Sequence, residues 1–156
     1  MRKNQKGFSL IELLIVVAII LIIAAIAIPN LLRSKMAANE ASAVGSMRTI
    51  NTACVAYSST YGIGFPAALV DLQPAAAATS TAADLIDSVL AAGTKSGYSF
   101  TYTAGAASNG VVPTYTLDAG PLALNQTGNR YFFTDQSGVI RQNVGAAATV
   151  ASTPIS

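Results

Sequence analysis

Glu12 lies in an apolar stretch, where a charged carboxylate is energetically unfavourable. Glu12 falls within a stretch from Phe8 to Ile28 in which Ser9 is the only other polar side chain, so no side chain there can neutralise it. An unpaired charge in an apolar, membrane-length helix is strongly unfavourable, and its presence indicates function. If the chain were cut between Gly7 and Phe8, the new amine of Phe8 would lie four residues before Glu12. The spacing then predicts a charge pair, within one helix or between neighbouring copies.

Outside this stretch we find no group of residues that suggests catalysis. The chain has no histidine, and Cys54 is its only cysteine, which excludes an intramolecular disulfide and a Cys/His metal site. Asp118 and Asp135 are isolated. Asp84 and Asp87 are three residues apart on a predicted surface helix. Because no Gly-rich phosphate loop follows a strand either, we predict no enzyme, no cofactor and no metal, with solvated carboxylates and a buried, apolar Cys54.

Composition favours a membrane and argues against nucleic acid as a partner. Hydrophobic residues make up 52% of the 156 residues, charged residues only 10%, and much of the apolar excess lies between Phe8 and Ile28. The formal net charge of +2 is misleading, because Arg2, Lys3 and Lys6 all precede Gly7. The remainder has six basic against seven acidic side chains. No basic face for nucleic acid is left.

The apolar stretch has the length of a membrane span. A helix of about 21 residues is roughly 31 Å long, close to the hydrocarbon thickness of a bilayer. A cleaved signal peptide is one explanation, with MRKNQK as its basic region and Ala25-Ile26-Ala27 as the cleavage site, but signal cores run only about 7 to 15 residues. A single-pass anchor with its basic start inside the cell explains length and orientation. It leaves Glu12 unexplained.

Several features of the first 35 residues coincide. A short basic leader ends in Lys6-Gly7 and is followed by Phe8-Ser9-Leu10-Ile11-Glu12-Leu13-Leu14, an unbroken apolar run and then Pro29. This combination closely resembles the N-terminus of the type IV pilins and of the related pseudopilins of type II secretion. The resemblance is specific over residues 1 to about 35, and beyond residue 60 it concerns architecture alone.

The resemblance implies a role for individual positions. Residues 1–7 would be a prepilin leader peptide, and Gly7 would precede the bond that prepilin peptidase cuts on the cytoplasmic side. Phe8 would become the new N-terminus, which this family usually N-methylates. Glu12 would pair with the N-terminus of a neighbouring subunit during docking. Pro29 would mark where the helix bends or locally melts in filaments, although a simple kink at the membrane exit explains it equally well.

Hydrophobic periodicity predicts a long first helix, from about Phe8 to Tyr61. Residues 8–29 form its transmembrane or filament-core half, and residues 30–61 its amphipathic half. In the second half, apolar side chains recur at spacings of three and four and form one stripe: Val44, Met47, Ile50, Cys54, Tyr57 and Tyr61. Gly62 is the expected stop. Such a stripe needs a cover, which the C-terminal half must supply.

The remaining residues predict a small α+β head. Residues 62–96 are expected to connect the long helix to the sheet. They would contain a short helical turn that begins at Pro66 and a second helix that follows the capping-box spacing of Thr81 and Asp84. Its apolar face is expected to contain Leu85, Ile86, Val89 and Leu90. Residues 97–142 alternate in polarity and predict an antiparallel sheet of about four strands, with turns at Asn109-Gly110 and at 135–138. The tail, 143–156, is expected to be disordered or to lie along the head surface.

The sequence leaves three hypotheses for function. The first is a structural subunit of a type IV pilus, processed between Gly7 and Phe8, that polymerises into a helical filament. The second is a pseudopilin, whose calcium site usually needs clustered carboxylates near the C-terminus, where the region after Tyr131 offers only Asp135. The third is a membrane-tethered binding domain that never polymerises. The Asn125-Gln126-Thr127 sequon also predicts a glycan acceptor.

For the favoured hypothesis the resemblance implies partners and location. The partners would be other pilin subunits, prepilin peptidase, the inner-membrane assembly machinery and, before assembly, membrane lipid. The precursor would cross the bacterial inner membrane once with its N-terminus in the cytoplasm. The assembled subunit would then lie in an extracellular filament.

Overall fold

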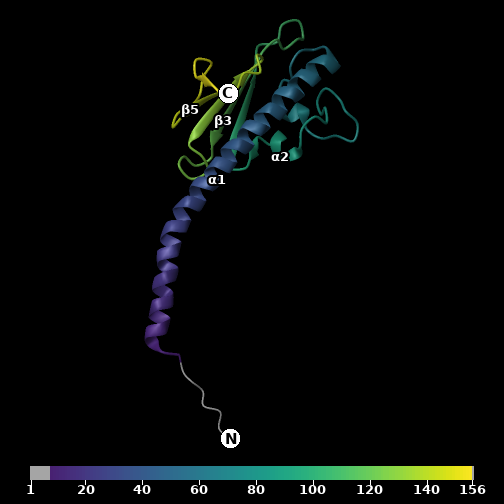
Figure 1. Cartoon of the computed structure of the whole chain (residues 1–156). Helices are drawn as coiled ribbons and strands as arrows, with labels where there is room; N and C mark the ends of the chain where they lie inside the picture. The colour runs from purple at the N-terminus through teal and green to yellow at the C-terminus, as the bar shows by residue number, and fades with distance from the viewer. Residues whose placement is uncertain (1–7, 156) are drawn as a thin grey trace. The chain divides into compact units, whose positions relative to one another are not determined.

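The computed structural model describes residues 8–155 and has the predicted α+β architecture (Figure 1). Residues 1–7, which the sequence predicts to be a leader peptide and which include Gly7, lie outside the described residues. The helical elements are α1 (Leu10–Tyr61), the 3-10 helix η1 (Leu69–Leu72) and α2 (Ser88–Ala91). The strands are β1 (Thr94–Lys95), β2 (Tyr98–Ala104), β3 (Tyr115–Pro121), β4 (Arg130–Asp135), β5 (Arg141–Val144) and β6 (Thr153–Pro154). The chain divides into two compact units, with the boundary after Lys35.

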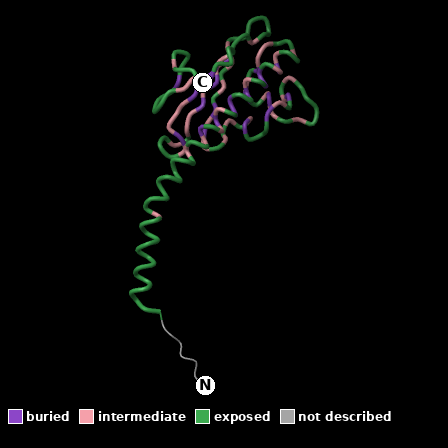
Figure 2. The backbone as a smooth tube through the Cα atoms, viewed as in Figure 1, coloured by how far each residue is buried: buried purple, intermediate pink, exposed green. Residues whose placement is uncertain are grey.

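In the first unit, α1 exposes apolar side chains on every side. Among the described residues it is the one helix long and apolar enough to cross a membrane, and its most apolar window has a mean hydropathy of 3.3. None of that window is buried within the chain, and Figure 2 shows the segment as almost continuously exposed. The helix runs through Pro29 without interruption. An apolar surface of this extent requires lipid or another protein as its cover.

In the second unit, α1 buries the predicted stripe. Met47, Ile50 and Cys54 are fully buried, and Tyr57 nearly so, whereas Val44 and Tyr61 are partly buried. Ala43 and Ala53 complete the buried face. The helix ends where the sequence predicts, because Gly62 adopts a φ of 66° and donates its N–H to the Ser58 carbonyl over 3.0 Å.

The predicted sheet is present, with two additional strands. Its six strands are antiparallel and follow one another in sequence order from β1 to β6. In β2 and β3, Tyr98, Phe100, Tyr115 and Leu117 are buried while the residues between them are more exposed, as the alternation predicts. β1 and β6 have only two residues each, too few to show a period in the sequence. The expectation of four strands is therefore corrected to six.

The tail is more ordered than predicted, since β6 lies within it. Thr153 pairs with Gln142, and Ile155 donates its N–H to the Ile140 carbonyl over 2.9 Å. Ala148 is buried as well. The C-terminal segment therefore adds an edge strand to the sheet.

Both predicted turns are confirmed. At the tip of the β2–β3 connection, Asn109 and Gly110 have φ values of 52° and 78°, and Ser108 and Val111 exchange two backbone hydrogen bonds. Positive φ at both central positions is the geometry of a type I′ hairpin turn. Between β4 and β5, Gly138 donates its N–H to the Asp135 carbonyl over 2.9 Å.

The connecting region departs from the prediction at its first turn of helix. η1 begins at Leu69 rather than at Pro66, which is itself fully buried. Leu69 and Leu72 are buried. The cap is supplied by Asp71, whose carboxylate accepts the Ala68 N–H over 2.9 Å.

The predicted capping box of the next helix is wrong. Asp84 has a φ of 55° and lies outside any helix, and α2 begins only at Ser88. The N–H groups of Leu85 and Ile86 both donate to the Leu72 carbonyl, so contacts with η1 hold this segment out of a helix. Asp87 is the actual cap, because its side chain accepts the Leu90 N–H over 2.9 Å.

The face predicted for this helix is also only partly correct. Ile86 and Leu90 are buried, Leu85 is partly buried, and Val89 is 55% exposed. α2 has only four residues, too few to align all four side chains on one face.

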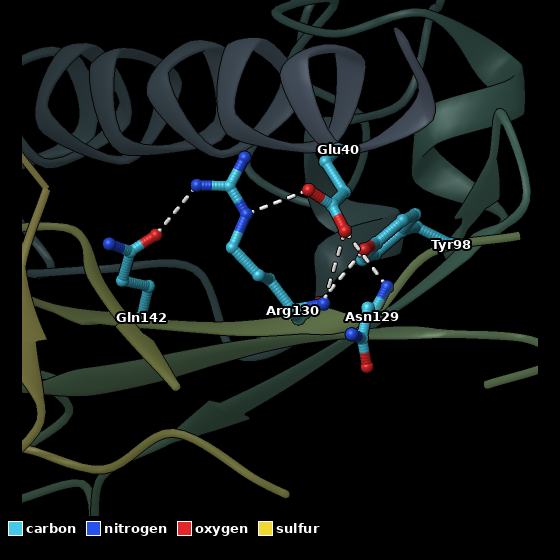
Figure 3. A network of polar contacts seen from close by, with 5 residues as sticks. All are labelled: Glu40, Tyr98, Asn129, Arg130 and Gln142. Carbon is cyan, nitrogen blue, oxygen red and sulfur yellow. Dashed lines mark hydrogen bonds and ion pairs between the residues drawn. The ribbon is translucent and has the colours of Figure 1, made fainter. Parts of the chain in front are cut away.

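A partly buried ion pair connects α1 to the sheet (Figure 3). The Glu40 carboxylate accepts hydrogen bonds from the Arg130 Nε over 2.7 Å and from the Asn129 N–H over 2.8 Å. Arg130 also donates through Nη1 to the Gln142 side chain, and the Tyr98 hydroxyl donates to the Arg130 carbonyl. Glu40 is only 8% exposed. The expectation that the carboxylates are solvated is therefore wrong for this residue.

This ion pair predicts a loss of stability in acid. Burial alone would raise the pKa of Glu40, but hydrogen bonds from Asn129 and Arg130 and the Arg130 charge together lower it from its usual 4.5. A depressed folded-state pKa stabilises the fold above the unfolded value, and the stabilisation is lost as pH falls through the folded value. We expect the free energy of unfolding, from urea titrations in detergent between about pH 7 and about pH 3, to fall more in the parent chain than in Glu40→Gln.

The comparison isolates Glu40 because other carboxylates contribute equally to both chains. The pKa of Asp87 is also lowered, chiefly by a hydrogen bond from Lys95, while burial raises that of Asp118. These two shifts act on stability with opposite signs. Parallel pH curves for the parent chain and Glu40→Gln would contradict a depressed pKa at Glu40.

Candidate processing and assembly site

Glu12 closes the first turn of α1. The helix begins at Leu10, and the Ser9 carbonyl accepts the Leu13 N–H over 3.2 Å. The Glu12 Oε2 in turn accepts the Ser9 N–H over 2.9 Å. Ser9 and Glu12 have the Ser-x-x-Glu spacing of a capping box, and a carboxylate at this position also interacts favourably with the helix dipole.

This contact corrects the sequence-based view of Glu12 as lacking any partner in its own stretch. The expectation concerned side chains alone, whereas the partner is the backbone N–H of Ser9. The Ser-x-x-Glu spacing in the sequence was the signal that could have revealed it.

The carboxylate keeps capacity for a second partner. Within the part of the chain that the structure describes, Oε1 of Glu12 has no hydrogen-bond partner. Phe8 immediately precedes the N–H that Oε2 accepts, lies outside the helix and is 81% exposed. An amine generated at Phe8 would therefore arise beside this carboxylate, and because an ionised carboxylate has about four acceptor positions, capping and pairing are compatible.

The other predicted site residues lie apart from Glu12 in the sequence and in different surroundings. Pro29 lies in the interior of α1, where it has no N–H to donate to the helix. Asn125 is exposed in the loop that joins β3 to β4, with a φ of 62°. In the same loop the Thr127 hydroxyl donates to the Ala123 carbonyl and accepts the Ala123 N–H.

Potential metal ligands are not grouped in the part of the chain that the structure describes. From residue 8 to 155, no three His, Cys, Asp or Glu side chains lie together as a metal site would require. Cys54 is fully buried as predicted, and burial raises the pKa of its thiol to about 12. It behaves as a small apolar core residue.

Known proteins match the N-terminal part of the chain. The family model of the prokaryotic N-terminal methylation motif matches residues 2–28. The type IV wide pilus major component PilA4 of Thermus thermophilus is 63% identical over 38 residues, which is 24% of this chain and 29% of the relative. A type IV major fimbrial protein FimA of Dichelobacter nodosus is 52% identical over 58 residues, which is 35% of this chain and 37% of the relative.

These similarities are local but fall on the candidate site. The chain spans about a third of the length of the curated relatives it matches, and no solved structure gives a significant match. The methylation motif contains Gly7, Phe8 and Glu12. The N-terminal third of the chain is thus similar to proteins named as type IV pilus and fimbrial subunits, and it contains a methylation motif.

Proposed function

We propose that the chain is the structural subunit of a type IV pilus. In this proposal, prepilin peptidase cuts between Gly7 and Phe8, the Phe8 amine is methylated, and the subunit then polymerises. The observation that carries the proposal is the exposed apolar half of α1. From Leu10 to Leu32 its large apolar side chains are between 46% and 77% exposed.

Such a helix can be covered in two ways that follow one another in time. Membrane lipid covers it before assembly, and the helices of neighbouring subunits cover it in the filament. Because lipid tails are as apolar as leucine side chains, the hydrophobic effect does not favour one cover over the other. Close packing and polar pairing must therefore determine when and in which register the subunits associate.

Glu12 supplies that polar pairing in the proposal. A carboxylate facing lipid is strongly unfavourable until it is paired. The Ser9 N–H satisfies one of its oxygens within the helix, but a backbone N–H carries no full charge to neutralise it. The Phe8 amine of a neighbouring subunit would provide this charge, so that docking in the correct register removes an unfavourable interaction.

Location and partners follow from the same segment. Arg2, Lys3 and Lys6 favour a cytoplasmic N-terminus for the precursor, with the head on the other side of the inner membrane. The proposed partners are further pilin subunits, the peptidase, the assembly machinery and membrane lipid. The relatives carry the names of pilus and fimbrial subunits, and we infer no catalytic activity for this chain.

Two secondary sites belong to the proposal. Pro29 would be the point at which α1 bends or melts in the filament, because the helix lacks one backbone hydrogen bond there. Asn125 would accept a glycan, since it is exposed in a surface loop and begins an Asn-x-Thr sequon.

Mass spectrometry and electron microscopy test the proposal together. We expect the protein, expressed with its assembly machinery, to have the intact mass of a chain that begins at Phe8 and carries one added methyl group. The same preparation should contain thin filaments. A chain that begins at Met1 or at Ile28, or a correctly processed chain that forms no filaments, would contradict the proposal.

A further inference from the structure

A small pocket opens on the face of the sheet that points away from the core. Phe100, Leu117 and Phe132 belong to the core on the other face. Because successive side chains of a strand alternate between the two faces, their neighbours along β2, β3 and β4 lie on the pocket side. The pocket has a volume of about 330 Å³, which is within the range of small-molecule sites. It is lined chiefly by Ser99, Thr101, Asp118, Tyr131, Ala147 and Ala148.

The pocket contains one carboxylate, and this carboxylate is unpaired. Asp118 on β3 lies directly opposite Thr101 on β2, so that a carboxylate and a hydroxyl are neighbours in the pocket wall. Neither of the ion pairs among the described residues includes Asp118. Burial raises the pKa of Asp118, and no neighbouring charge or hydrogen bond lowers it again. Since no side-chain oxygen from residue 8 to 155 is both fully buried and without a partner, the Asp118 carboxylate must open to the pocket.

Tyr131 supplies an aromatic wall, and Gly120 makes room for it. A Cβ atom placed at Gly120 would lie 3.0 and 3.1 Å from two carbons of the Tyr131 ring. These distances are shorter than the about 3.5 to 4.0 Å of ordinary carbon contacts, so the ring packs against the bare backbone of β3. Beside it, the Ser99 hydroxyl donates to the Gly120 carbonyl over 3.2 Å. The Ser99 oxygen keeps its lone pairs for a ligand.

The C-terminal segment forms the remaining wall. The Asn143 side chain donates to the Ala147 carbonyl over 3.2 Å, and the Gly145 N–H donates to the Asn129 carbonyl over 2.9 Å. Ala148 is only 4% exposed. These contacts hold the segment against the sheet, so that three strands and the tail together build the pocket.

The charge of Asp118 determines the class of ligand. An anion would be repelled, and a neutral molecule would leave a partly desolvated carboxylate uncompensated. One carboxylate and two hydroxyls are too few for calcium, which takes 6 to 8 oxygen ligands. A primary ammonium group fits the arrangement, because its three N–H donors match the Asp118 carboxylate and the hydroxyls of Ser99 and Thr101. The face of the Tyr131 ring attracts the same positive charge.

We propose that this pocket binds a small primary amine, with the ammonium group on Asp118 and the carbon chain against Tyr131 and Ala148. The inference assigns the head a ligand in addition to the proposed structural role. It does not depend on that role, because every residue of the pocket belongs to the second unit and none takes part in the proposed processing or docking.

Fluorine NMR of the full chain in a nonionic detergent tests the proposal. The chain is labelled with 3-fluorotyrosine, and the Tyr131 signal is assigned by its loss in Tyr131→Phe. We expect 4-aminobutan-1-ol to shift the Tyr131 signal saturably at about pH 7, where the amine is charged. We expect 1,4-butanediol, which has a hydroxyl in place of the ammonium group, to cause no saturable shift. This comparison needs only the parent chain, so it stands even if a variant fails to fold.

Two variants of equal charge locate the binding. Asp118→Asn is expected to raise the dissociation constant of 4-aminobutan-1-ol at least about tenfold, because a charge-assisted contact is lost. Asp135→Asn is the matched control, since Asp135 lines a neighbouring pocket and already accepts the Ser137 N–H over 2.8 Å. We expect it to change the dissociation constant less than about twofold. Unchanged signals of the core residues Tyr98 and Tyr115 verify that both variants are folded.

Three results would overturn the proposal. The first is a Tyr131 signal that does not respond to the amine. The second is an equal response to 1,4-butanediol or to methyl glucoside, which would assign the pocket to neutral polyols. The third is an equal loss of binding in Asp118→Asn and Asp135→Asn, which would reduce the effect to the net charge of the head. None of these results affects the proposed assembly into filaments, which mass spectrometry and electron microscopy test separately.

Discussion

A chain carrying Glu12→Ala is expected to be cut after Gly7, methylated and retained in the membrane, yet to yield more than about tenfold fewer filaments than the parent chain. A tenfold change corresponds to about 1.4 kcal/mol, and pairing a carboxylate in an apolar helix exceeds this amount. Filaments counted by electron microscopy, with intact mass as a check on processing, measure the effect.

Glu12→Gln separates the two roles of this residue. Glutamine still offers an oxygen to the Ser9 N–H and so preserves the helix cap, but it has no charge for the Phe8 amine. We expect Glu12→Gln to be as defective as Glu12→Ala. Normal filaments from Glu12→Gln alone would show that capping is what matters, and normal filaments from both would reject pairing altogether.

Removal of Glu40 is expected to have the largest effect on the stability of the head. Breaking a buried ion pair costs about 3 to 5 kcal/mol, and Glu40→Ala also leaves the Asn129 N–H without its acceptor. Because the Arg130 side chain remains 40% exposed, we expect a loss of about 2 to 4 kcal/mol. Urea unfolding of the full chain in detergent measures the loss.

An exposed ion pair in the same head provides the matched control. Lys95 and Asp87 are 2.9 Å apart, with side chains 36% and 48% exposed. Lys95→Ala is expected to cost less than about 1 kcal/mol. If Glu40→Ala and Lys95→Ala lowered the free energy of unfolding equally, the Glu40–Arg130 pair would contribute no more to stability than the exposed pair.

The sequence predicts those elements whose information is local and repeated. The stripe from Met47 to Tyr57 spans several helical turns, and Tyr98 to Tyr102 alternate over a whole strand, so both patterns are visible without a structure. The end of α1 depends on a single residue, Gly62, because glycine readily adopts the positive φ found there. Gly7, Phe8 and Glu12 are likewise close neighbours in one motif.

What sequence analysis missed depends on residues that are distant along the chain. Glu40 and Arg130 are ninety residues apart, and nothing near Glu40 indicates a buried partner. Asn51 on α1 accepts a hydrogen bond from Tyr115 and donates one to Thr134, and both partners lie in the sheet. The start of α2 at Ser88 depends on hydrogen bonds to Leu72. In each case the deciding interaction forms only after the chain has folded.

The cap at the start of α1 also bears on proteolysis. Ser9 and Glu12 end the helix at Leu10, so that Phe8, on the leaving side of the proposed cut, has no helical hydrogen bonds to break. A protease that binds its substrate in an extended conformation could therefore bind Phe8 without first unwinding α1. In the proposed sequence of events Glu12 would therefore act twice, first by keeping Phe8 out of the helix and then by pairing with the amine that cleavage would create.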